Sequence, residues 1–347
     1  MIITDHLDNT LRVLLRSYDA SQICAVADES VPFEAPYPVL RINADEADKT
    51  IDSVAHIWDF LFGHGMTRRG VLLCVGGGIV TDMGGFAAAT YKRGIDYINV
   101  PTTLLAMVDA STGGKTGINY RGLKNAVGCF ASPVETVIVP GWLDTLPFRQ
   151  FLSGFGEMLK TGLIEPDATA CREGRLWNRL LQYDLDAPLS QDGIATLVAA
   201  CIGVKDRYVA ADPKENGLRK ALNFGHTFGH ALEEMSFVHR TPSAEPMLHG
   251  YAVVYGMIAE LYLSVTRMGC PKEPLQQLTR LMLHYYGKPD CRCSDREGLV
   301  RLMQQDKKNE HAAEINCTLL KAVGEPVVNR IISPAEANEA LEYLFSL

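Results

Sequence analysis

Short apolar runs alternate with helical stretches over the first 150 residues of the chain. The runs with strand character are QICAVAD, PVLRINA, GVLLCVGGG, IDYINVPTT and ETVIVPG, and helical stretches such as ADKTIDSVAHIWDFLFGHG and TDMGGFAAATYKRG lie among them. Parallel strands need such crossovers, because each helix returns the chain to the edge where the next strand begins. The rhythm predicts an α/β fold with a mostly parallel sheet covered by helices.

The pattern changes near residue 150. Beyond it, apolar residues recur at helical spacing in IATLVAACIGVKDRYVAAD, PLQQLTRLMLHYYG and REGLVRLMQQDKKN, and a short strand is predicted in EINCTLLKAVG. A chain of 347 residues is also long for a single hydrophobic core. We therefore predict an α/β domain over residues 1–150 and a mainly α-helical domain over residues 151–347.

Charge and composition exclude several classes of protein. The net charge of −8 provides no basic excess to neutralise nucleic acid. The stretch YAVVYGMIAELYLSV carries Glu260 and is too short and too polar to cross a membrane, so we expect a buried helix. The N-terminus lacks the charged and apolar segments of a signal peptide. Nine scattered cysteines predict reduced thiols in a cytoplasmic protein.

A glycine-rich turn, VLLCVGGGIVTDMGGF, leads from a predicted strand into a predicted helix. Consecutive glycines let the backbone approach a ligand, and a helix N-terminus offers unpaired N–H groups to a phosphate. The motif is neither G-x-G-x-x-G nor a P-loop, so a tight turn without a ligand is an equal alternative.

A second polar segment, NVPTTLLAMVDASTGGKTGINYRGLKNAVG, follows the next predicted strand. Basic and amide groups among its glycines favour a polar anionic ligand, whereas a solvated loop would explain the lysines alone. The residues with this chemistry are Thr102, Thr103, Asp109, Lys115, Asn119, Lys124 and Asn125.

A histidine pair stands in LNFGHTFGHALEE. His226 and His230 are four residues apart and would share one face of a helix. The pair is not the H-E-x-x-H motif of metalloproteases, because Thr227 follows the first histidine. Glu233 and Glu234, about two turns beyond His226, could hydrogen-bond a ligand histidine or simply lie on the surface.

Two further motifs add candidate metal ligands. SGFGEMLK places Glu157, with Lys160 one turn later, at what we expect to be a helix start, and MLHGYAV places His249 at another. Glu157, His226 and His249 would form a His₂Glu set suited to catalytic zinc. The pattern alone leaves open whether His230 or His249 is the third ligand.

Together these motifs resemble the 3-dehydroquinate synthases. The resemblance covers nearly the whole chain from about Glu46, in order and at fitting separations. It is carried by GGGIVTDMGGFAAATYKRGI, VPTTLLAMVDASTGGKTGIN, GLKNAVGCF, LDTLPFRQFLSGFGEMLKTGLI, LRKALNFGHTFGHALE, LHGYAVVYGM and DKKN. Other sugar-phosphate cyclases are sister enzymes of this family, and iron-type polyol dehydrogenases are more distant relatives.

The resemblance implies a Rossmann-like NAD-binding domain, a mainly helical domain, and one divalent metal ion, zinc or cobalt. It implies that Glu157, His226 and His249 bind the metal while His230 contacts the substrate. The residues that match the family's NAD contacts are Glu46, Lys49, Gly78, Ile79, Val80, Thr81, Asp82, Thr102, Thr103, Lys115, Lys124, Trp142, Leu143, Asp144 and Thr145. Those that match its substrate contacts are Asp109, Lys115, Asn125, Lys160, Lys205, Arg219, Asn223, His230 and one of Lys307 and Lys308. A homodimer is also implied, in which Arg93 reaches the substrate phosphate of the partner subunit.

Three positions depart from the family pattern. Tyr251 stands where an acidic residue usually follows His-Gly, Ser30 where an asparagine is common, and Asp45 where a glycine is common. None of them is a matched catalytic position, but the surroundings of the metal and of the adenosine ribose are expected to differ.

The activity implied by the resemblance is that of a lyase. It converts 3-deoxy-D-arabino-heptulosonate 7-phosphate into 3-dehydroquinate and phosphate, in the shikimate pathway to chorismate and the aromatic amino acids. The implied steps are transient oxidation by NAD, phosphate elimination, re-reduction, ring opening and aldol closure. The alternatives are another sugar-phosphate cyclase, a polyol dehydrogenase, and a non-catalytic protein that binds metal and nucleotide.

Overall fold

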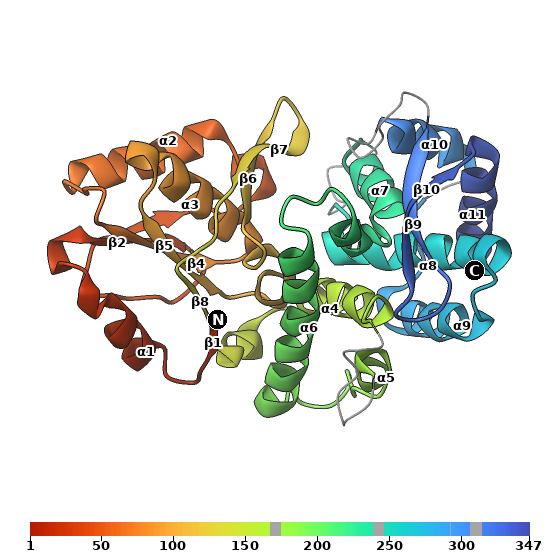
Figure 1. Cartoon of the computed structure of the whole chain (residues 1–347), viewed down its shortest axis with the longest axis horizontal. Coiled ribbons are helices and arrows are strands. Elements are labelled where there is room, and N and C mark those ends of the chain that lie inside the picture. Colours follow the sequence, from red (N-terminus) through yellow and green to blue (C-terminus); the bar gives the residue numbers. More distant parts are fainter. Residues whose placement is uncertain (167–174, 239–245, 292, 306–313) are drawn as a thin grey trace. The chain divides into compact units, whose positions relative to one another are not determined.

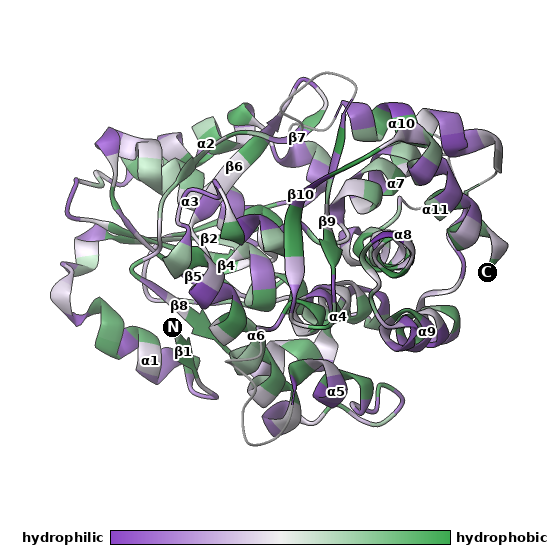
Figure 2. Ribbon diagram, turned by 45° about the vertical axis from the view of Figure 1, so that its right-hand side comes forward, coloured by the Kyte–Doolittle hydropathy of each residue, from purple (hydrophilic) through white to green (hydrophobic). Residues whose placement is uncertain are grey.

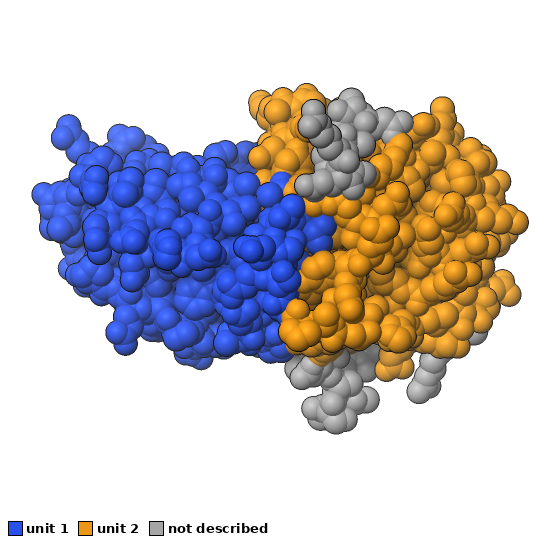
Figure 3. Space-filling model, turned by 90° about the horizontal axis from the view of Figure 1, so that it is seen from below, with its two compact units in different colours: residues 1–147, 189–199 blue, residues 148–188, 200–347 orange. Residues whose placement is uncertain are grey.

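The computed structural model describes residues 1–166, 175–238, 246–291, 293–305 and 314–347 (Figure 1). The chain forms two compact units, which Figure 3 distinguishes by colour. Unit 1 contains Met1–Pro147 and Leu189–Ala199, and unit 2 contains Phe148–Pro188 and Ala200–Leu347. The units are not two consecutive halves of the sequence, because Leu189–Ala199 groups with the N-terminal residues.

Unit 1 is built on a six-stranded sheet with the order β1-β8-β5-β4-β2-β3. Every pairing in this sheet is parallel, so the predicted α/β fold with a mostly parallel sheet is confirmed. Its strands are β1 (Ile2–Ile3), β2 (Ile23–Asp28), β3 (Val39–Ile42), β4 (Val71–Gly76), β5 (Asp96–Pro101) and β8 (Glu135–Ile138).

Helices cover both faces of this sheet. Alternate residues of the central strand β4 point to opposite sides, as the two-residue period of a strand requires. Leu72 and Cys74 pack in a core with α2 (Ile51–Gly63) and α3 (Gly78–Thr90). Leu73 and Val75 pack in the second core, with α1 (Leu7–Leu14). Burial of both faces explains why these strands read as continuous apolar runs in the sequence.

Part of the polar segment of unit 1 forms an antiparallel hairpin, which the sequence did not indicate. Its strands are β6 (Lys115–Tyr120) and β7 (Leu123–Phe130). Arg121 and Gly122 both have positive φ, 50° and 80°, as a two-residue type I′ turn requires. Gly117 pairs with Gly128, and a Cβ on Gly128 would lie 2.1 Å from the Thr116 oxygen. In the sequence these glycines suggested a loop, but in the structure they let two strands approach closely.

Unit 2 is mainly helical, with one two-stranded antiparallel sheet. The expected strand in EINCTLLKAVG is present as β9, and it pairs with β10. Exposed helices such as α9 carry hydrophobic and hydrophilic residues on different faces (Figure 2). The elements are α4 (Phe148–Leu163), α5 (Leu176–Leu181), the part of α6 (Gln191–Ala211) from Ala200 on, α7 (His226–Val238), α8 (His249–Met268), α9 (Lys272–Leu281), α10 (Arg296–Gln304), β9 (Ile315–Leu320), β10 (Pro326–Ile332) and α11 (Pro334–Ser346).

Helix α8 is the centre of unit 2. Most of its residues from Gly250 to Ser264 are buried, and the Glu260 side chain is fully buried, so the expected buried helix is confirmed. It packs against α4, α7, α11 and β9. Within the described ranges, no helix has the length and apolarity needed to cross a membrane.

Candidate metal centre

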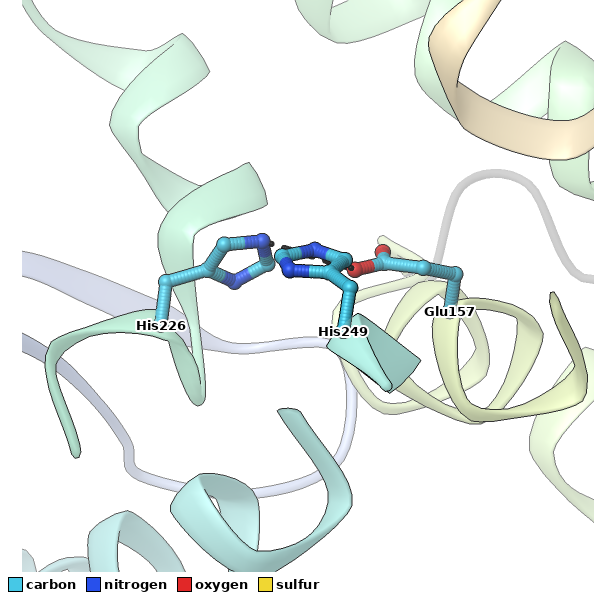
Figure 4. Close-up of side chains that lie close together, drawn as sticks. All are labelled: Glu157, His226 and His249. Carbon is cyan, nitrogen blue, oxygen red and sulfur yellow. Dashed lines mark hydrogen bonds and ion pairs between the residues drawn. The ribbon is translucent and has the colours of Figure 1, made fainter. Parts of the chain in front are cut away.

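Three side chains from three helices of unit 2 converge on one point (Figure 4). Glu157 comes from α4, and His226 and His249 are the first residues of α7 and α8. Glu157 Oε1 lies 3.2 Å from His249 Nε2 and 3.4 Å from His226 Nε2. One ligand atom from each residue lies within 4.8 Å of the others. Two imidazole nitrogens and one carboxylate oxygen are a donor set typical of catalytic zinc, so these residues fit a divalent ion.

Each of the three residues adjoins a glycine at a helix contact. A Cβ on Gly156 would lie 2.5 Å from the Gly250 oxygen, and one on Gly250 would lie 1.8 Å from the Ser153 oxygen. A Cβ on Gly256 would lie 1.9 Å from the oxygen of Gly225, which precedes His226. The backbones of α4 and α7 therefore touch α8 directly, and this contact brings the three ligands together.

The two histidines present their Nε2 atoms to Glu157 because their Nδ1 atoms face acceptors. His226 Nδ1 lies 3.1 Å from the Phe224 carbonyl oxygen, and His249 Nδ1 lies 3.1 Å from Glu233 Oε2. An Nδ1–H that donates to these oxygens fixes each ring and leaves Nε2 for a metal ion. Of the two neighbouring glutamates, Glu233 is the buried one that orients His249, and Glu234 is exposed.

Glu157 is held in its charged form by a buried lysine. Lys160 Nζ lies 2.5 Å from Glu157 Oε2, and both side chains are almost completely buried. Burial raises the pKa of Glu157, but the Lys160 charge and the hydrogen bond from His249 outweigh burial and hold the pKa below its usual range. We expected Glu157 to begin a helix, but it lies inside α4. The expectation was wrong because the glycines before it serve helix packing and do not end a helix.

Protonated His249 is the preferred form in the absence of a metal ion. Burial lowers the pKa of His249, but the charge of Glu233 and the hydrogen bonds to Glu157 and Glu233 raise it to about 10. The side chain therefore carries a positive charge between two carboxylates near neutral pH. A metal ion that binds Nε2 must displace this proton.

The described geometry favours His249 over His230 as the third ligand. The His230 ring lies 5.2 Å from that of His226 and 5.9 Å from that of His249, measured between centroids. His230 thus lies beside the three ligands, but Glu157 contacts His226 and His249. This arrangement suits His230 for contact with a molecule bound at the metal.

The remaining predicted substrate contacts of unit 2 occupy two elements. Lys205 lies on α6 and Arg219 and Asn223 lie on the 3₁₀ segment Leu218–Asn223. Lys205 is 7% exposed and Arg219 is 2% exposed. Arg219 Nη1 donates to the Pro213 oxygen at 2.8 Å, and Asn223 Nδ2 donates to Glu215 Oε1 at 2.7 Å. Lys307 and Lys308 lie outside the described residues.

In unit 1 the predicted cofactor and substrate residues form one polar network. Lys49, only 4% exposed, donates to Asp82 Oδ2 at 2.6 Å and to Asn125 Oδ1 at 2.5 Å. Asn119 donates to Glu46 Oε1 at 2.7 Å and accepts from the Asn125 backbone N–H at 2.9 Å. The structure therefore joins Glu46, Lys49, Asp82 and Asn125. The bridging role of Asn119 was not foreseen.

The glycine turn joins β4 directly to α3. Gly77 is the N-cap of this helix, and no side chain caps it. A Cβ on Gly76 would lie 2.6 Å from Val80 Cγ2, so close packing alone requires a glycine there. The Thr102 N–H donates to the Gly76 oxygen at 3.0 Å, which places the end of β5 beside the turn. The turn is therefore tight for structural reasons and also presents the N-terminus of a 13-residue helix.

The other predicted residues of unit 1 lie on neighbouring elements. Thr103 Oγ1 accepts from the Ala106 N–H at 3.2 Å, and Asp109 lies in the π-helical segment Ala106–Ala110. Lys115 begins β6 and Lys124 lies in β7. Arg93 is exposed and has a φ of 69°. Ile79, Val80 and Thr81 lie in the first turn of α3, and Trp142, Leu143, Asp144 and Thr145 lie in the 3₁₀ segment Pro140–Thr145.

The three departures from the family pattern each have a local contact. The Tyr251 ring packs edge-on against Tyr286, with 4.8 Å between centroids. Ser30 donates to Asp28 Oδ1 at 2.8 Å, and Asp45 accepts from the Ala47 N–H at 2.9 Å. Tyr251 leaves no acidic group directly after His249-Gly250, and Glu233 provides the carboxylate that His249 contacts.

Sequence comparison places these features in a known family. Models of the 3-dehydroquinate synthase N-terminal and C-terminal domains match residues 39–153 and 154–309. The chain belongs to the 3-dehydroquinate synthase family. It is 42% identical over 330 residues to the 3-dehydroquinate synthase of Parabacteroides distasonis, which covers 95% of this chain and 90% of the relative. It is 37% identical over 325 residues to that of Streptococcus pyogenes serotype M18, with 89% and 86% covered.

Solved structures share the fold. The 2-epi-5-epi-valiolone synthase from Streptomyces hygroscopicus subsp. jinggangensis, with NAD⁺ and Zn²⁺ bound, matches with a TM-score of 0.81 and 25% identity. A 2-deoxy-scyllo-inosose synthase complexed with carbaglucose-6-phosphate, NAD⁺ and Co²⁺ matches with a TM-score of 0.80 and 23% identity. Both matches cover 99% of this chain and 96% of the neighbour. The fold and the family expected from the sequence are therefore confirmed.

Removal of the third ligand should empty the metal site. We expect His249→Ala to lose the bound metal and His230→Ala to keep it, because His249 contacts Glu157 and Glu233 and is one of the three residues whose ligand atoms converge. The measurement is the molar ratio of zinc to protein after gel filtration. A His230→Ala protein without metal would show that the ligand assignment is wrong.

Metal binding should release a proton from His249. Because the pKa of His249 is about 10, the ring is protonated at neutral pH, whereas a metal ion binds neutral imidazole. We expect zinc affinity to rise with pH up to about that value. Calorimetry in buffers of different ionisation enthalpy measures the protons released.

Glu233→Gln and Glu234→Gln are matched variants for this experiment. Glu233→Gln should release fewer protons, because the charge that raises the pKa of His249 is removed, and Glu234→Gln should behave as the unmodified protein. Equal release by all three would contradict the prediction. The same ion pairs stabilise the metal-free protein fully below the ordinary histidine pKa, and this stabilisation is lost as pH rises through about 10.

Proposed function

We propose that this chain is a 3-dehydroquinate synthase. It converts 3-deoxy-D-arabino-heptulosonate 7-phosphate into 3-dehydroquinate and phosphate. The observation that carries the proposal is the convergence of Glu157, His226 and His249, with Lys160 and His230 beside them, in a chain of this family. Each of these five residues matches a family position.

The residues present fit one divalent ion and NAD. Glu157, His226 and His249 would hold the ion, zinc or cobalt, and the turn at Gly78 with Thr102 and Thr103 would hold NAD. The ion would act as a Lewis acid on substrate hydroxyls, and NAD would supply a reversible hydride acceptor. The valiolone synthase with NAD⁺ and Zn²⁺ bound supports NAD and a divalent ion as the groups that this fold binds.

Buried cations favour an anionic substrate over a neutral polyol. Lys160, Lys205 and Arg219 are each less than 10% exposed. Cations that the surrounding protein holds in fixed positions stabilise negative charge on a bound molecule, such as a phosphate or a carboxylate of the substrate. This charge pattern argues against a polyol dehydrogenase. His230, beside the ligand histidines, can exchange a proton with the bound substrate at a ring nitrogen.

The homodimer is part of this proposal. A hollow of about 430 Å³ in unit 1 is lined by Gly94–Tyr97, directly after Arg93, and by the end of the hairpin. Phe130 and Val134, which also line this hollow, are 61% and 54% exposed. A second copy over these apolar side chains would bring Arg93 to the neighbouring chain.

The described cysteines are thiols, which supports the cytoplasm as the location.

The test of the function is phosphate release from the heptulosonate phosphate. We expect one phosphate per substrate with NAD in catalytic amount, because the hydride that NAD accepts is returned. Phosphate and absorbance of NADH are measured together. Accumulation of NADH equal to the product would favour a dehydrogenase, and no release with any NAD supply would refute the proposal.

The shared site is tested by mixing two inactive variants. Arg93→Ala should damage the site of the partner subunit, because a guanidinium binds phosphate through two hydrogen bonds. Lys205→Ala should damage the site of its own chain. If the variants are unfolded and refolded together, about half of the dimers are mixed, and about one quarter of all sites are intact, by random pairing.

Recovered phosphate release after mixing is the expected result. If Arg93 serves its own chain, every site keeps one defect and no activity returns. Native mass spectrometry shows whether mixed dimers have formed. Mixed dimers without recovered activity would refute the shared site.

A further inference from the structure

A buried carboxylate from α8 meets the start of α7. Glu260 is 0% exposed, and its two oxygens accept from the backbone N–H groups of Gly225 at 2.7 Å and Thr227 at 3.2 Å. These two N–H groups flank His226, the first residue of α7. The N–H groups at a helix start have no partner inside the helix, and the helix dipole favours a negative charge there. Glu260 therefore provides hydrogen-bond acceptors for the backbone N–H groups on both sides of His226, a candidate metal ligand.

The backbone around His226 leaves Glu260 little freedom. Gly225 has a φ of 81°, and a Cβ on it would lie 2.5 Å from Met257 Cγ, one turn before Glu260 on α8. Thr227 Oγ1 donates to the Asn316 oxygen at 2.9 Å. The turn that carries His226 is thus fixed by α8 on one side and by β9 on the other.

The His226 ring depends on the same turn. Its Nδ1 lies 3.1 Å from the oxygen of Phe224, the residue before Gly225. A shift of this turn would move the imidazole and the acceptor that orients it together. The Glu260 carboxylate is the anion that holds the turn in place.

We propose that Glu260 is a positioning residue for the metal site, which acts on His226 through the backbone N–H groups of Gly225 and Thr227. It does not touch the metal or the substrate. This inference rests on the proposed function only in that Glu157, His226 and His249 bind a divalent ion. Each ligand histidine then has a glutamate that positions it. Glu233 contacts the ring of His249 directly, whereas Glu260 holds the backbone on both sides of His226.

The test compares Glu260→Gln with Ser264→Ala. Glutamine has the size of glutamate but no charge. Its carbonyl oxygen can accept from one of the two backbone N–H groups, but its NH₂ group, a donor, would face the other. Ser264 is a matched control, because it is also 0% exposed and lies one turn further along α8, where its hydroxyl donates to the Glu260 carbonyl oxygen at 2.6 Å and accepts from the Leu320 N–H at 2.9 Å, so Ser264→Ala perturbs this part of α8 but keeps the Glu260 carboxylate. Both variants should lower the melting temperature of the metal-free protein.

Only Glu260→Gln should weaken metal binding. We expect about a 10- to 100-fold loss of zinc affinity, measured by competition with a chelator, which is the usual effect of removing a group that orients a ligand. The visible absorption spectrum of the cobalt-substituted protein should change as well, because it reports ligand geometry. Ser264→Ala should keep both the zinc affinity and the spectrum.

Zinc affinity and a cobalt spectrum equal to the unmodified protein in Glu260→Gln would overturn the proposal. If Glu260→Gln does not fold, Glu260→Asp replaces it, since aspartate keeps the charge and shortens the reach by one methylene. We then expect a several-fold loss of affinity, and unchanged affinity overturns the proposal. These measurements need no substrate, so a chain whose zinc affinity depends on Glu260 but that releases no phosphate would refute only the proposed function.

Discussion

Direct backbone contact between helices is the constraint on which the metal centre depends. Gly156, Gly250, Gly225 and Gly256 remove the Cβ atoms that would otherwise separate α4 and α7 from α8. Three ligand atoms can then lie within 4.8 Å of one another although they come from three different helices. Because each ligand directly adjoins one of these glycines, a methyl group added there would displace the ligand itself as well as the helix.

The charges of the centre follow from this packing. Close helices exclude water, so each buried carboxylate needs a specific partner. Glu157 has Lys160 and the two histidines, Glu233 has His249, and Glu260 has the N-terminus of α7. The negative charges of Glu157 and Glu233 beside the two histidines favour a dication, and the positive charge of metal-free His249 substitutes for part of it. Packing and electrostatics thus favour the same occupant.

The sequence predicts those parts of the structure in which one pattern has one physical cause. The apolar runs of β2, β4 and β5 reflect burial on both faces of a parallel sheet, and they were recognised for that reason. Glycine occurs in a sequence for several structural reasons, and its role was misinterpreted at two places. It concealed the hairpin of β6 and β7, which is mostly exposed, and it suggested a helix start at Glu157 where it marks a helix contact. Helical spacing could have distinguished Glu233 from Glu234, because position i+7 returns to the face of His226.

The network in unit 1 limits how a cofactor can bind there. The ammonium group of Lys49 has three N–H donors, and bonds to Asp82 and Asn125 already use two of them. At most one donor is left for NAD unless one of these bonds breaks. The same lysine joins Asp82, a predicted cofactor contact on α3, to Asn125, a predicted substrate contact on β7. If these assignments hold, a cofactor that draws Lys49 away from Asn125 would release that amide oxygen for the substrate, and we therefore expect cofactor and substrate binding to be coupled through this buried cation.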